Sequence, residues 1–227
     1  MEYQPCPLCR TPAMPRAEAP HGRRLFDCAA CGALHLDPAL RLSPELEHAH
    51  YLHHQNSPAD AGYRHFLNRL AIPLVERLAP GASGLDYGSG PGPTLSVMLR
   101  EQGFRMKEYD PFFAPDVAPL NDRYDFITCT EVVEHFHAPA EEFKRLVAML
   151  RPGGILAVMT EVLREEQPLE QWRYLRDPTH VVFYRPKCFS WIAAHHRLQL
   201  EMPRPNVALL RRPQGPESPL SPMTVTP

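Results

Sequence analysis

The sequence predicts an α/β protein built on a parallel sheet, with a small metal-binding module towards its N-terminus. Two observations lead to this prediction. A short apolar strand runs into a glycine-rich turn, and an apolar helix leaves that turn near Thr94. Two Cys-x-x-Cys pairs stand ahead of this region. At 227 residues the chain has room for one main domain with a substantial core and one small appendage.

The glycine-rich turn carries glycines at alternate positions, namely Gly88, Gly90 and Gly92. Glycine is needed where the backbone takes a positive φ or where a ligand lies directly against the main chain. The helix that follows directs its free N–H groups and its positive dipole end at the turn. We therefore expect a site for the polar end of a ligand at the carboxyl edge of the sheet. Pro93 replaces the third glycine of a dinucleotide fingerprint, and no Gly-Lys-Ser/Thr follows, so neither of those nucleotide loops is predicted.

The segment from Asp86 to Gly92 resembles motif I of the class I S-adenosylmethionine (SAM) methyltransferases, Asp/Glu-x-Gly-x-Gly-x-Gly. Asp110 follows at the tip of the next strand, where an acidic residue about twenty positions beyond the glycines accepts hydrogen bonds from ribose hydroxyls. Residues 124–136 and the Leu-Arg-Pro-Gly-Gly-Ile-Leu junction are similar to two later family motifs. The resemblance implies a Rossmann-like methyltransferase fold, SAM as cofactor, and cofactor contacts from Asp86, Gly88, Gly90, Gly92, Asp110, Phe112 and Thr130, with Phe112 beside the adenine.

Apolar periodicity and chain breakers indicate the remaining elements. We expect helices at 43–54, 59–78 with a kink at Pro73, 94–102, 139–151 and 185–196. We expect strands at 104–109, 124–129 and 155–160, and an antiparallel terminal hairpin at 198–202 and 207–211. Only residues 111–123 separate the second strand from the next one, which is too short for the helix, strand and helix of the family. The third-strand edge of the sheet should therefore be trimmed.

The chain divides into four expected parts. Residues 1–38 form a zinc ribbon, 39–80 a helical linker or cap, 81–212 the SAM-dependent methyltransferase domain, and 213–227 a proline-rich tail that we expect to be disordered.

The cysteines Cys6, Cys9, Cys28 and Cys31 form two Cys-x-x-Cys knuckles with eighteen residues between them. Four thiolates at this spacing can close a tetrahedron around zinc, and the segment resembles a zinc ribbon. Two disulfides are the alternative, but thiols stay reduced in the cytoplasm. The apolar residues of the segment, Leu8, Leu25, Phe26 and Leu34, are too few for a core. Metal binding, worth ~10–16 kcal/mol in small zinc modules, should therefore supply the fold.

Glu131, Glu134 and His135 share one face if their turn is helical, and His180 arrives from a loop after the fifth strand. Two carboxylates and two imidazoles can bind a divalent cation. This pattern resembles the metal-dependent O-methyltransferases of small-RNA 3′ ends and of the ubiquinone pathway, which implies Mg²⁺ or Mn²⁺ at a second metal site. In the alternative, Glu134 and His135 only hydrogen-bond loops around the SAM site. We take His135, His180 and Glu131 as the candidate catalytic residues, acting as bases or as metal ligands.

Charge and targeting features restrict the functional classes. The net charge is −2 with a pI of about 6.6, so no global field attracts nucleic acid or an anionic membrane. The longest apolar runs, such as 155–159, are far short of the ~20 residues of a membrane-spanning helix. The first residues lack a signal peptide, so we expect a cytoplasmic protein.

Three functions fit these observations. The first is O-methylation of a small metabolite or a sugar-like hydroxyl, with a small molecule as the substrate. The second is RNA methylation with the ribbon gripping the RNA, as in a ribosomal-RNA guanine methyltransferase family that also begins with four zinc cysteines, although the neutral charge balance counts against it. The third is a non-catalytic interaction protein with a SAM fold, against which the intact Asp86, glycines and Asp110 count.

Overall fold

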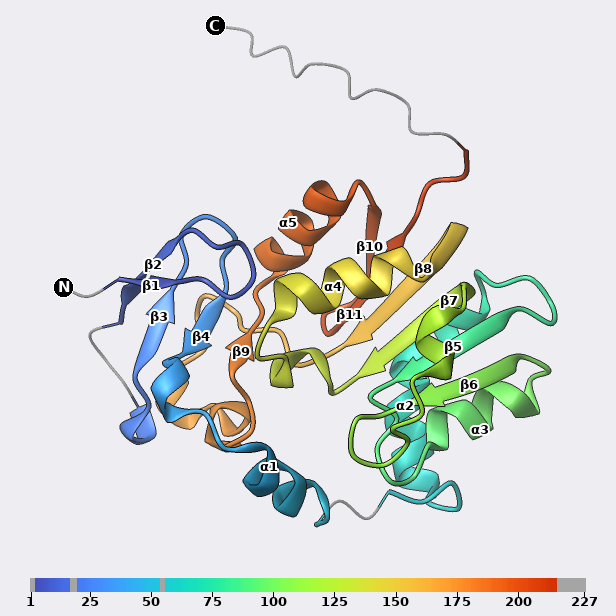
Figure 1. Ribbon diagram of the computed structural model, residues 1–227, viewed down its shortest axis with the longest axis horizontal. Coiled ribbons are helices and arrows are strands. Elements are labelled where there is room, and N and C mark those ends of the chain that lie inside the picture. The colour runs from blue at the N-terminus through green and yellow to red at the C-terminus, as the bar shows by residue number, and fades with distance from the viewer. Residues whose placement is uncertain (1–2, 17–19, 54–55, 216–227) are drawn as a thin grey trace, which may run out of the picture.

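The computed structural model describes residues 3–16, 20–53 and 56–215 (Figure 1). Its centre is a six-stranded sheet in the order β10-β11-β8-β7-β5-β6. Four strands run parallel to one another: β5 (Ser83–Tyr87), β6 (Arg105–Tyr109), β7 (Tyr124–Thr130) and β8 (Leu150–Met159). An antiparallel hairpin of β10 (Gln199–Arg204) and β11 (Val207–Arg211) completes the sheet beside β8. The predicted α/β architecture and its terminal hairpin are confirmed.

The trimmed edge of the sheet is also confirmed. β6 has no strand on its outer side among the described residues. Only the short 3-10 helix η3 (Ala118–Asn121) lies between β6 and β7.

Helices cover both faces of the sheet (Figure 1). α2 (Ala61–Val75) and α3 (Thr94–Glu101) pack on one face, and α4 (Pro139–Ala148) and α5 (Pro186–His196) on the other. The sheet side chains alternate between the two resulting cores, as a period of two requires. The α2 side contains Phe126, Ile155, Ala157 and Met159, and the α4 side contains Ile127, Cys129, Leu156 and Val158.

Several element boundaries differ from the sequence-based expectation. The helix expected at 139–151 ends at Ala148, and β8 begins at Leu150 rather than at 155. Tyr124 explains the difference, because this first residue of β7 already pairs with Leu150 and therefore draws the chain into the sheet early. The helix expected at 43–54 is α1 (Pro44–Tyr51), which ends short of the expected boundary, and residue 54 lies outside the described part. The expected tail lies outside the described residues from 216 onward.

The four-cysteine module forms a second sheet together with the main domain. Four short strands, β1 (Gln4–Pro5), β2 (Pro12–Pro15), β3 (Leu25–Asp27) and β4 (Leu34–Leu36), are joined by β9 (Val182–Phe183) in the order β1-β2-β3-β4-β9. All neighbours in this sheet are antiparallel. In Figure 1 the module lies against the side of the domain that carries α4, α5 and β9.

The module also shares a core with the main domain. Leu8, Leu25 and Leu34 belong to the same buried cluster as Phe183 and Tyr184. The expectation that metal binding alone supplies the fold of residues 1–38 is therefore too narrow, because burial against the main domain contributes as well. This packing joins residues more than a hundred positions apart, which local sequence patterns do not reveal.

The remaining elements are short helical turns. They are η1 (Pro20–Gly22), η2 (Pro38–Leu40), η4 (Val133–His135), η5 (Leu169–Gln171) and η6 (Arg173–Arg176). Among the described residues, no helix has both the length and the apolar character that crossing a bilayer requires.

Gly84 tests how tightly the sheet packs on its α2 side. A Cβ at this position in β5 would lie 2.3 Å from the Phe126 ring and 2.8 Å from the Met106 sulfur. We expect Gly84→Ala to lower the free energy of unfolding by ~1–3 kcal/mol through overpacking, measured by urea denaturation. Gly62→Ala in the exposed first turn of α2 is the control and should change it by less than ~1 kcal/mol. Equal stabilities of Gly84→Ala and wild type would contradict the packing described here.

Candidate active site and four-cysteine centre

A cleft of about 910 Å³ opens where the parallel strands end. Tyr87, Tyr109 and Thr130, the last residues of β5, β6 and β7, all line it. Residues of α1, including Glu47 and Tyr51, line it as well. The volume lies within the ~300–1,000 Å³ typical of small-molecule sites.

The three glycines of the turn meet different requirements. Gly88 (φ +78°) donates its N–H to the Tyr109 carbonyl at 2.7 Å, and a Cβ there would lie 2.5 Å from Val132. A Cβ on Gly92 would lie 2.1 Å from the Asn56 carbonyl oxygen. Gly90 (φ +65°) differs, because no described atom lies within 4 Å of its Cβ position. Gly88 and Gly92 thus allow close chain packing, and Gly90 exposes its backbone to the cleft.

Asp110 organises the loop around Gly90. Its Oδ2 accepts the Gly90 N–H at 2.9 Å, and its Oδ1 accepts the N–H groups of Phe112 at 2.8 Å and Phe113 at 3.0 Å. A carboxylate oxygen can accept more than one hydrogen bond, so this cleft-lining group retains capacity for ligand hydroxyls.

Asp86 lies deeper and is 5% exposed. Its two oxygens accept hydrogen bonds from the Thr128 hydroxyl at 2.6 Å and the Ser96 hydroxyl at 3.4 Å. Burial raises the pKa of Asp86 to about 6, against the opposing effect of the Thr128 hydrogen bond. Asp86 therefore ties the beginning of the turn to β7 and α3, while it also lines the cleft.

Two further predicted cofactor residues line the same cleft. The Phe112 ring stacks on His48 of α1, with 5.1 Å between ring centroids and 5° between planes. The Thr130 hydroxyl is buried and has no hydrogen-bond partner in the described part of the chain. An unpaired buried hydroxyl costs ~1–3 kcal/mol, which a polar ligand in the cleft would offset. The open backbone at Gly90 and this unpaired hydroxyl both fit SAM.

The structure brings Glu134, His135 and His180 together, with one ligand atom of each within 4.8 Å of the others. Glu134 is fully buried, and its carboxylate accepts hydrogen bonds from the Thr160 hydroxyl at 2.9 Å and from the Tyr174 hydroxyl. The ring centroids of His135 and His180 are 4.8 Å apart. Tyr174 and Thr160 were not anticipated, because the segment after β8 contains no recognisable motif around them.

Both histidines are oriented by backbone carbonyls. His135 Nδ1 lies 3.1 Å from the Thr179 carbonyl, and His180 Nδ1 lies 2.7 Å from the Tyr174 carbonyl. A carbonyl oxygen only accepts hydrogen bonds, so these contacts assign the ring proton to Nδ1 and leave the lone pair on Nε2. Histidines that bind a metal are commonly held in the same way, by a hydrogen bond from the other ring nitrogen. Burial and the neighbouring His135 lower the pKa of His180 to about 4, so His180 is neutral near pH 7.

Glu131 does not join this group, contrary to the expected four-residue set. The expectation assumed a helical turn from Glu131 onward, but Glu131 has a left-handed backbone (φ +52°) and η4 begins only at Val133. Its N–H donates to the Met159 carbonyl at 2.8 Å. Burial, followed by the charges of Glu134 and Glu161, raises the pKa of Glu131 to about 9. Glu131 therefore lines the cleft as a neutral acid near pH 7.

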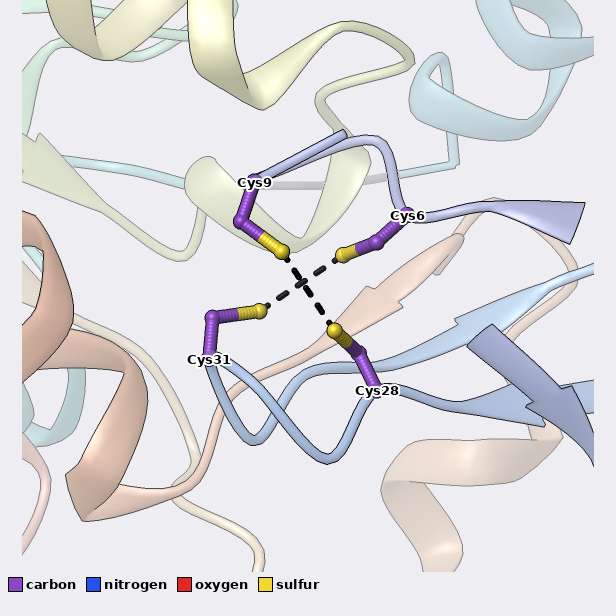
Figure 2. Close-up of side chains that lie close together, drawn as sticks. All are labelled: Cys6, Cys9, Cys28 and Cys31. Carbon is purple, nitrogen blue, oxygen red and sulfur yellow. Dashed lines mark hydrogen bonds between the residues drawn. The ribbon is translucent and has the colours of Figure 1, made fainter. Parts of the chain in front are cut away.

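The four predicted zinc cysteines converge on one point (Figure 2). The Sγ atoms of Cys6 and Cys31 are 3.5 Å apart, and those of Cys9 and Cys28 are 3.3 Å apart. Zn–S bonds of ~2.3 Å in a tetrahedron place the sulfurs about 3.8 Å apart, close to this arrangement. The contact with Cys31 lowers the pKa of Cys6 to about 5, and the same contact raises the pKa of Cys31. The two thiols therefore do not ionise together at this distance, and a divalent cation bound between them would stabilise both as thiolates.

The two knuckles have matching backbones. Arg10 (φ +67°) donates its N–H to the Cys6 carbonyl at 2.9 Å, and Gly32 (φ +82°) donates to the Cys28 carbonyl at 2.8 Å. Each left-handed residue directly follows its Cys-x-x-Cys pair and folds the chain around the sulfurs. The donor set, its spacing and this geometry all fit zinc.

We expect freshly purified, reduced protein to carry one zinc per chain, measured by elemental analysis. Cys28→Ser should remove most of it, because a neutral hydroxyl replaces a thiolate ligand. Cys188→Ser is the matched control, because Cys188 is equally buried but outside the cluster, and its zinc content should equal that of wild type. Absence of zinc from wild-type protein would rule out the assignment.

The sequence of the chain matches a known protein family. The model of the methyltransferase domain family matches residues 63–201. Ubiquinone biosynthesis O-methyltransferase of Aeromonas salmonicida (strain A449) is 28% identical over 86 residues, which is 38% of this chain and 36% of that protein. The same enzyme of Pseudomonas savastanoi pv. phaseolicola is 32% identical over 73 residues, 32% of this chain and 31% of that protein. The alignments thus span about a third of the length of these relatives.

Solved structures are similar at lower identity. An O-methyltransferase family protein from Burkholderia thailandensis matches with a TM-score of 0.48 and 14% identity, over 75% of this chain and 64% of that one. The 1,6-didemethyltoxoflavin-N1-methyltransferase of the same organism, with bound 1,6-didemethyltoxoflavin and S-adenosylhomocysteine, matches with a TM-score of 0.47 and 17% identity, over 89% and 100% of the two chains. The family assignment rests on the sequence match, which covers more than half of the 227 residues: the chain belongs to the methyltransferase domain family.

Proposed function

We propose that the protein is a SAM-dependent methyltransferase that methylates a hydroxyl group of a small molecule. One observation carries the proposal: the glycine turn with Asp110 and the pair His135 and His180 line a single cleft. A cofactor at the turn and a hydroxyl beside the histidines would share that space. We call the part of the cleft at the glycine turn the cofactor half and the part beside His135 and His180 the acceptor half.

In the cofactor half, the glycine turn and the ends of the strands supply the groups that would bind SAM. The backbone of Gly90, the carboxylate of Asp110 and the unpaired hydroxyl of Thr130 are the groups that would hold SAM. When bound, SAM supplies an electrophilic methyl group on its sulfonium. The protein then contributes mainly by aligning the acceptor oxygen with that methyl group, and such positioning is worth up to ~7–11 kcal/mol.

The acceptor half can activate a hydroxyl in two ways. His135, with its Nδ1 proton held by the Thr179 carbonyl, can take the hydroxyl proton at Nε2. Alternatively, Glu134, His135 and His180 would hold Mg²⁺ or Mn²⁺, which lowers the pKa of a bound hydroxyl. The first way is favoured by the Glu134 carboxylate, which is already engaged by Thr160 and Tyr174. His180 is a weak base because of its lowered pKa and would orient the acceptor rather than deprotonate it.

Aromatic side chains form one wall of the cleft, against which the ring of an aromatic acceptor would pack. The rings of Tyr51 and Phe112 are 5.6 Å apart, and the Tyr51 ring meets the His135 ring edge-on at 5.4 Å. Oxygen as the accepting atom is supported by the O-methyltransferase relatives. Phenols and catechols are therefore the first acceptors to test.

The alternative of RNA methylation is disfavoured by the charges of the module. Arg10 pairs with Glu141, Arg16 with Asp27, and Arg24 with Asp37. Arg23 donates to two backbone carbonyls. Each arginine of the described module residues thus has an acidic or carbonyl partner within the protein, which reduces the positive charge that the module offers to phosphates. The cleft is also acidic, with lining residues Glu47, Asp86, Asp110, Glu142, Glu161 and Asp177 against Arg145 and Arg173.

Two substitutions test the cofactor half by calorimetric SAM titration. Asp110→Ala should weaken SAM binding by ~1.5–3 kcal/mol, because it removes charge-assisted contacts to the ribose and three loop hydrogen bonds. Gly90→Val should weaken it more, because its side chain would occupy ligand space. Gly103→Val is the matched control, since Gly103 (φ +86°) also has open space at its Cβ but lies outside the cleft. Unchanged affinity in both cleft variants would refute this SAM site.

Turnover tests the acceptor half. The protein is incubated with SAM and a panel of phenols and catechols, and release of S-adenosylhomocysteine is measured. We expect turnover of at least one acceptor and a loss of about 10²–10⁴-fold in His135→Ala, the range for a general base. His53→Ala, two residues beyond the end of α1 and outside the Glu134 group, should retain the wild-type rate.

Chelation distinguishes the two ways of activating the hydroxyl, provided that the zinc content of the module is checked in the same samples. Activity that falls with chelator and returns with Mg²⁺ or Mn²⁺ indicates metal activation. Full activity with chelator leaves His135 as the base. Tight SAM binding with no formation of S-adenosylhomocysteine in the presence of any acceptor would contradict the proposed O-methylation. It would favour the non-catalytic alternative.

A further inference from the structure

The loop that carries His180 is attached to the four-cysteine module along its backbone. β9 pairs with β4, with Leu34 opposite Phe183 and His35 opposite Val182. The Leu36 N–H continues this ladder by donating to the Val181 carbonyl at 2.9 Å. The module thus reaches within one residue of His180.

The other side of the same loop is attached to η4, the turn that carries Glu134 and His135. The Val181 N–H donates to the Glu134 carbonyl at 2.9 Å, and the His135 ring contacts the Thr179 carbonyl. The residues around His180 therefore lie between the module and the turn that carries Glu134 and His135. A shift of the module edge would be transmitted to His180 through these hydrogen bonds.

Arg23 makes the contact that reaches His180 itself. Its Nη1 donates to the His180 carbonyl at 3.0 Å, and its Nη2 donates to the Asp177 carbonyl. The planar guanidinium fork suits two acceptors on one short loop. Arg23 follows His21 (φ +57°) and Gly22 (φ +70°), so a left-handed turn directs the chain before β3 towards this loop. A strained backbone of this kind persists only where its surroundings hold it.

We propose that Arg23 is a positioning residue for His180, so that the four-cysteine module sets the geometry of the acceptor half of the active site. The functional part of this inference rests on the proposed role of the His180 site. The structural part, that Arg23 holds residues 177–181 in place, can be tested without any acceptor.

Apart from the β4–β9 ladder and the Leu36–Val181 hydrogen bond, the module also contacts the domain through side chains at α4 and at the start of α5. Arg185 donates to the Gly32 carbonyl at 2.7 Å and Lys187 to the Ala29 carbonyl at 2.6 Å, both at the start of α5. Arg10 pairs with Glu141 on α4. These contacts dock the knuckles and remain when Arg23 is replaced. Loss of Arg23 should therefore loosen the His180 loop without detaching the module.

Hydrogen–deuterium exchange of the full chain, followed by peptide mass spectrometry, tests the structural part. In Arg23→Met we expect amide exchange in a peptide covering 177–183 to be at least about tenfold faster than in wild type, because two charge-assisted hydrogen bonds are lost. Arg23→Lys, with one ammonium in place of the fork, should give an intermediate rate. Peptides from the glycine turn at 84–92 and the zinc content should match wild type.

Arg16→Met is the matched control. Arg16 lies in the same module and pairs with Asp27 at 2.9 Å, but none of its contacts reaches the His180 loop. Its exchange at 177–183 should equal that of wild type. Unchanged exchange in Arg23→Met would overturn the proposal, and so would equal loosening of the module, the glycine turn and the loop, which would show a purely structural role.

Once an acceptor is turned over, kinetics test the functional part. Arg23→Met should lower kcat about tenfold or more and leave the KM for SAM unchanged, with partial rescue by Arg23→Lys. An unchanged kcat with a loosened loop would overturn the link to His180. Lack of any turnover in wild type concerns the proposed function and leaves the exchange result decisive for the positioning of the loop.

Discussion

The parallel pairing of β5 with β6 on one side and β7 on the other is the constraint on which the candidate site depends. Gly84, Leu85 and Asp86 of β5 are paired with both neighbours, so the three strands end at one edge in a fixed register. That register places the glycine turn between Asp110 and Thr130. Asp110 then closes the arrangement by accepting the Gly90 N–H. A ligand at the turn meets groups from three strands without any of them having to move.

The glycine turn and its contact with Asp110 could be predicted from the sequence because their determinants are local. Glycine spacing, an acid at the next strand tip and a helix start together define a turn within one βαβ unit. The trimmed edge was predictable for a similar reason, since residues 111–123 are too few to hold another strand and two helices. The knuckles were predictable from the spacing of Cys6, Cys9, Cys28 and Cys31, and the structure brings their sulfurs together.

The group of Glu134, His135 and His180 was only partly predictable because its determinants are distant or conformational. Glu131 shares a sequence motif with Glu134, but a single left-handed φ removes it from the group. Tyr174 lies in a motif-free segment and reaches Glu134 only through the tertiary fold. The union of the module with β9 joins residues 34–36 to residues 181–183, and no periodicity in the sequence indicates such a pairing.

The shortened sheet has a consequence for the solution behaviour of the protein. With no strand beyond it in the described part of the chain, β6 presents a row of backbone groups to which a strand of another molecule could add. Charged side chains on an edge strand discourage such pairing. β6 carries Arg105 and Lys107 as exposed side chains, and Lys107 is paired with Asp122 at 2.6 Å. These charged side chains, one of them ion-paired, thus disfavour the addition of another strand to β6.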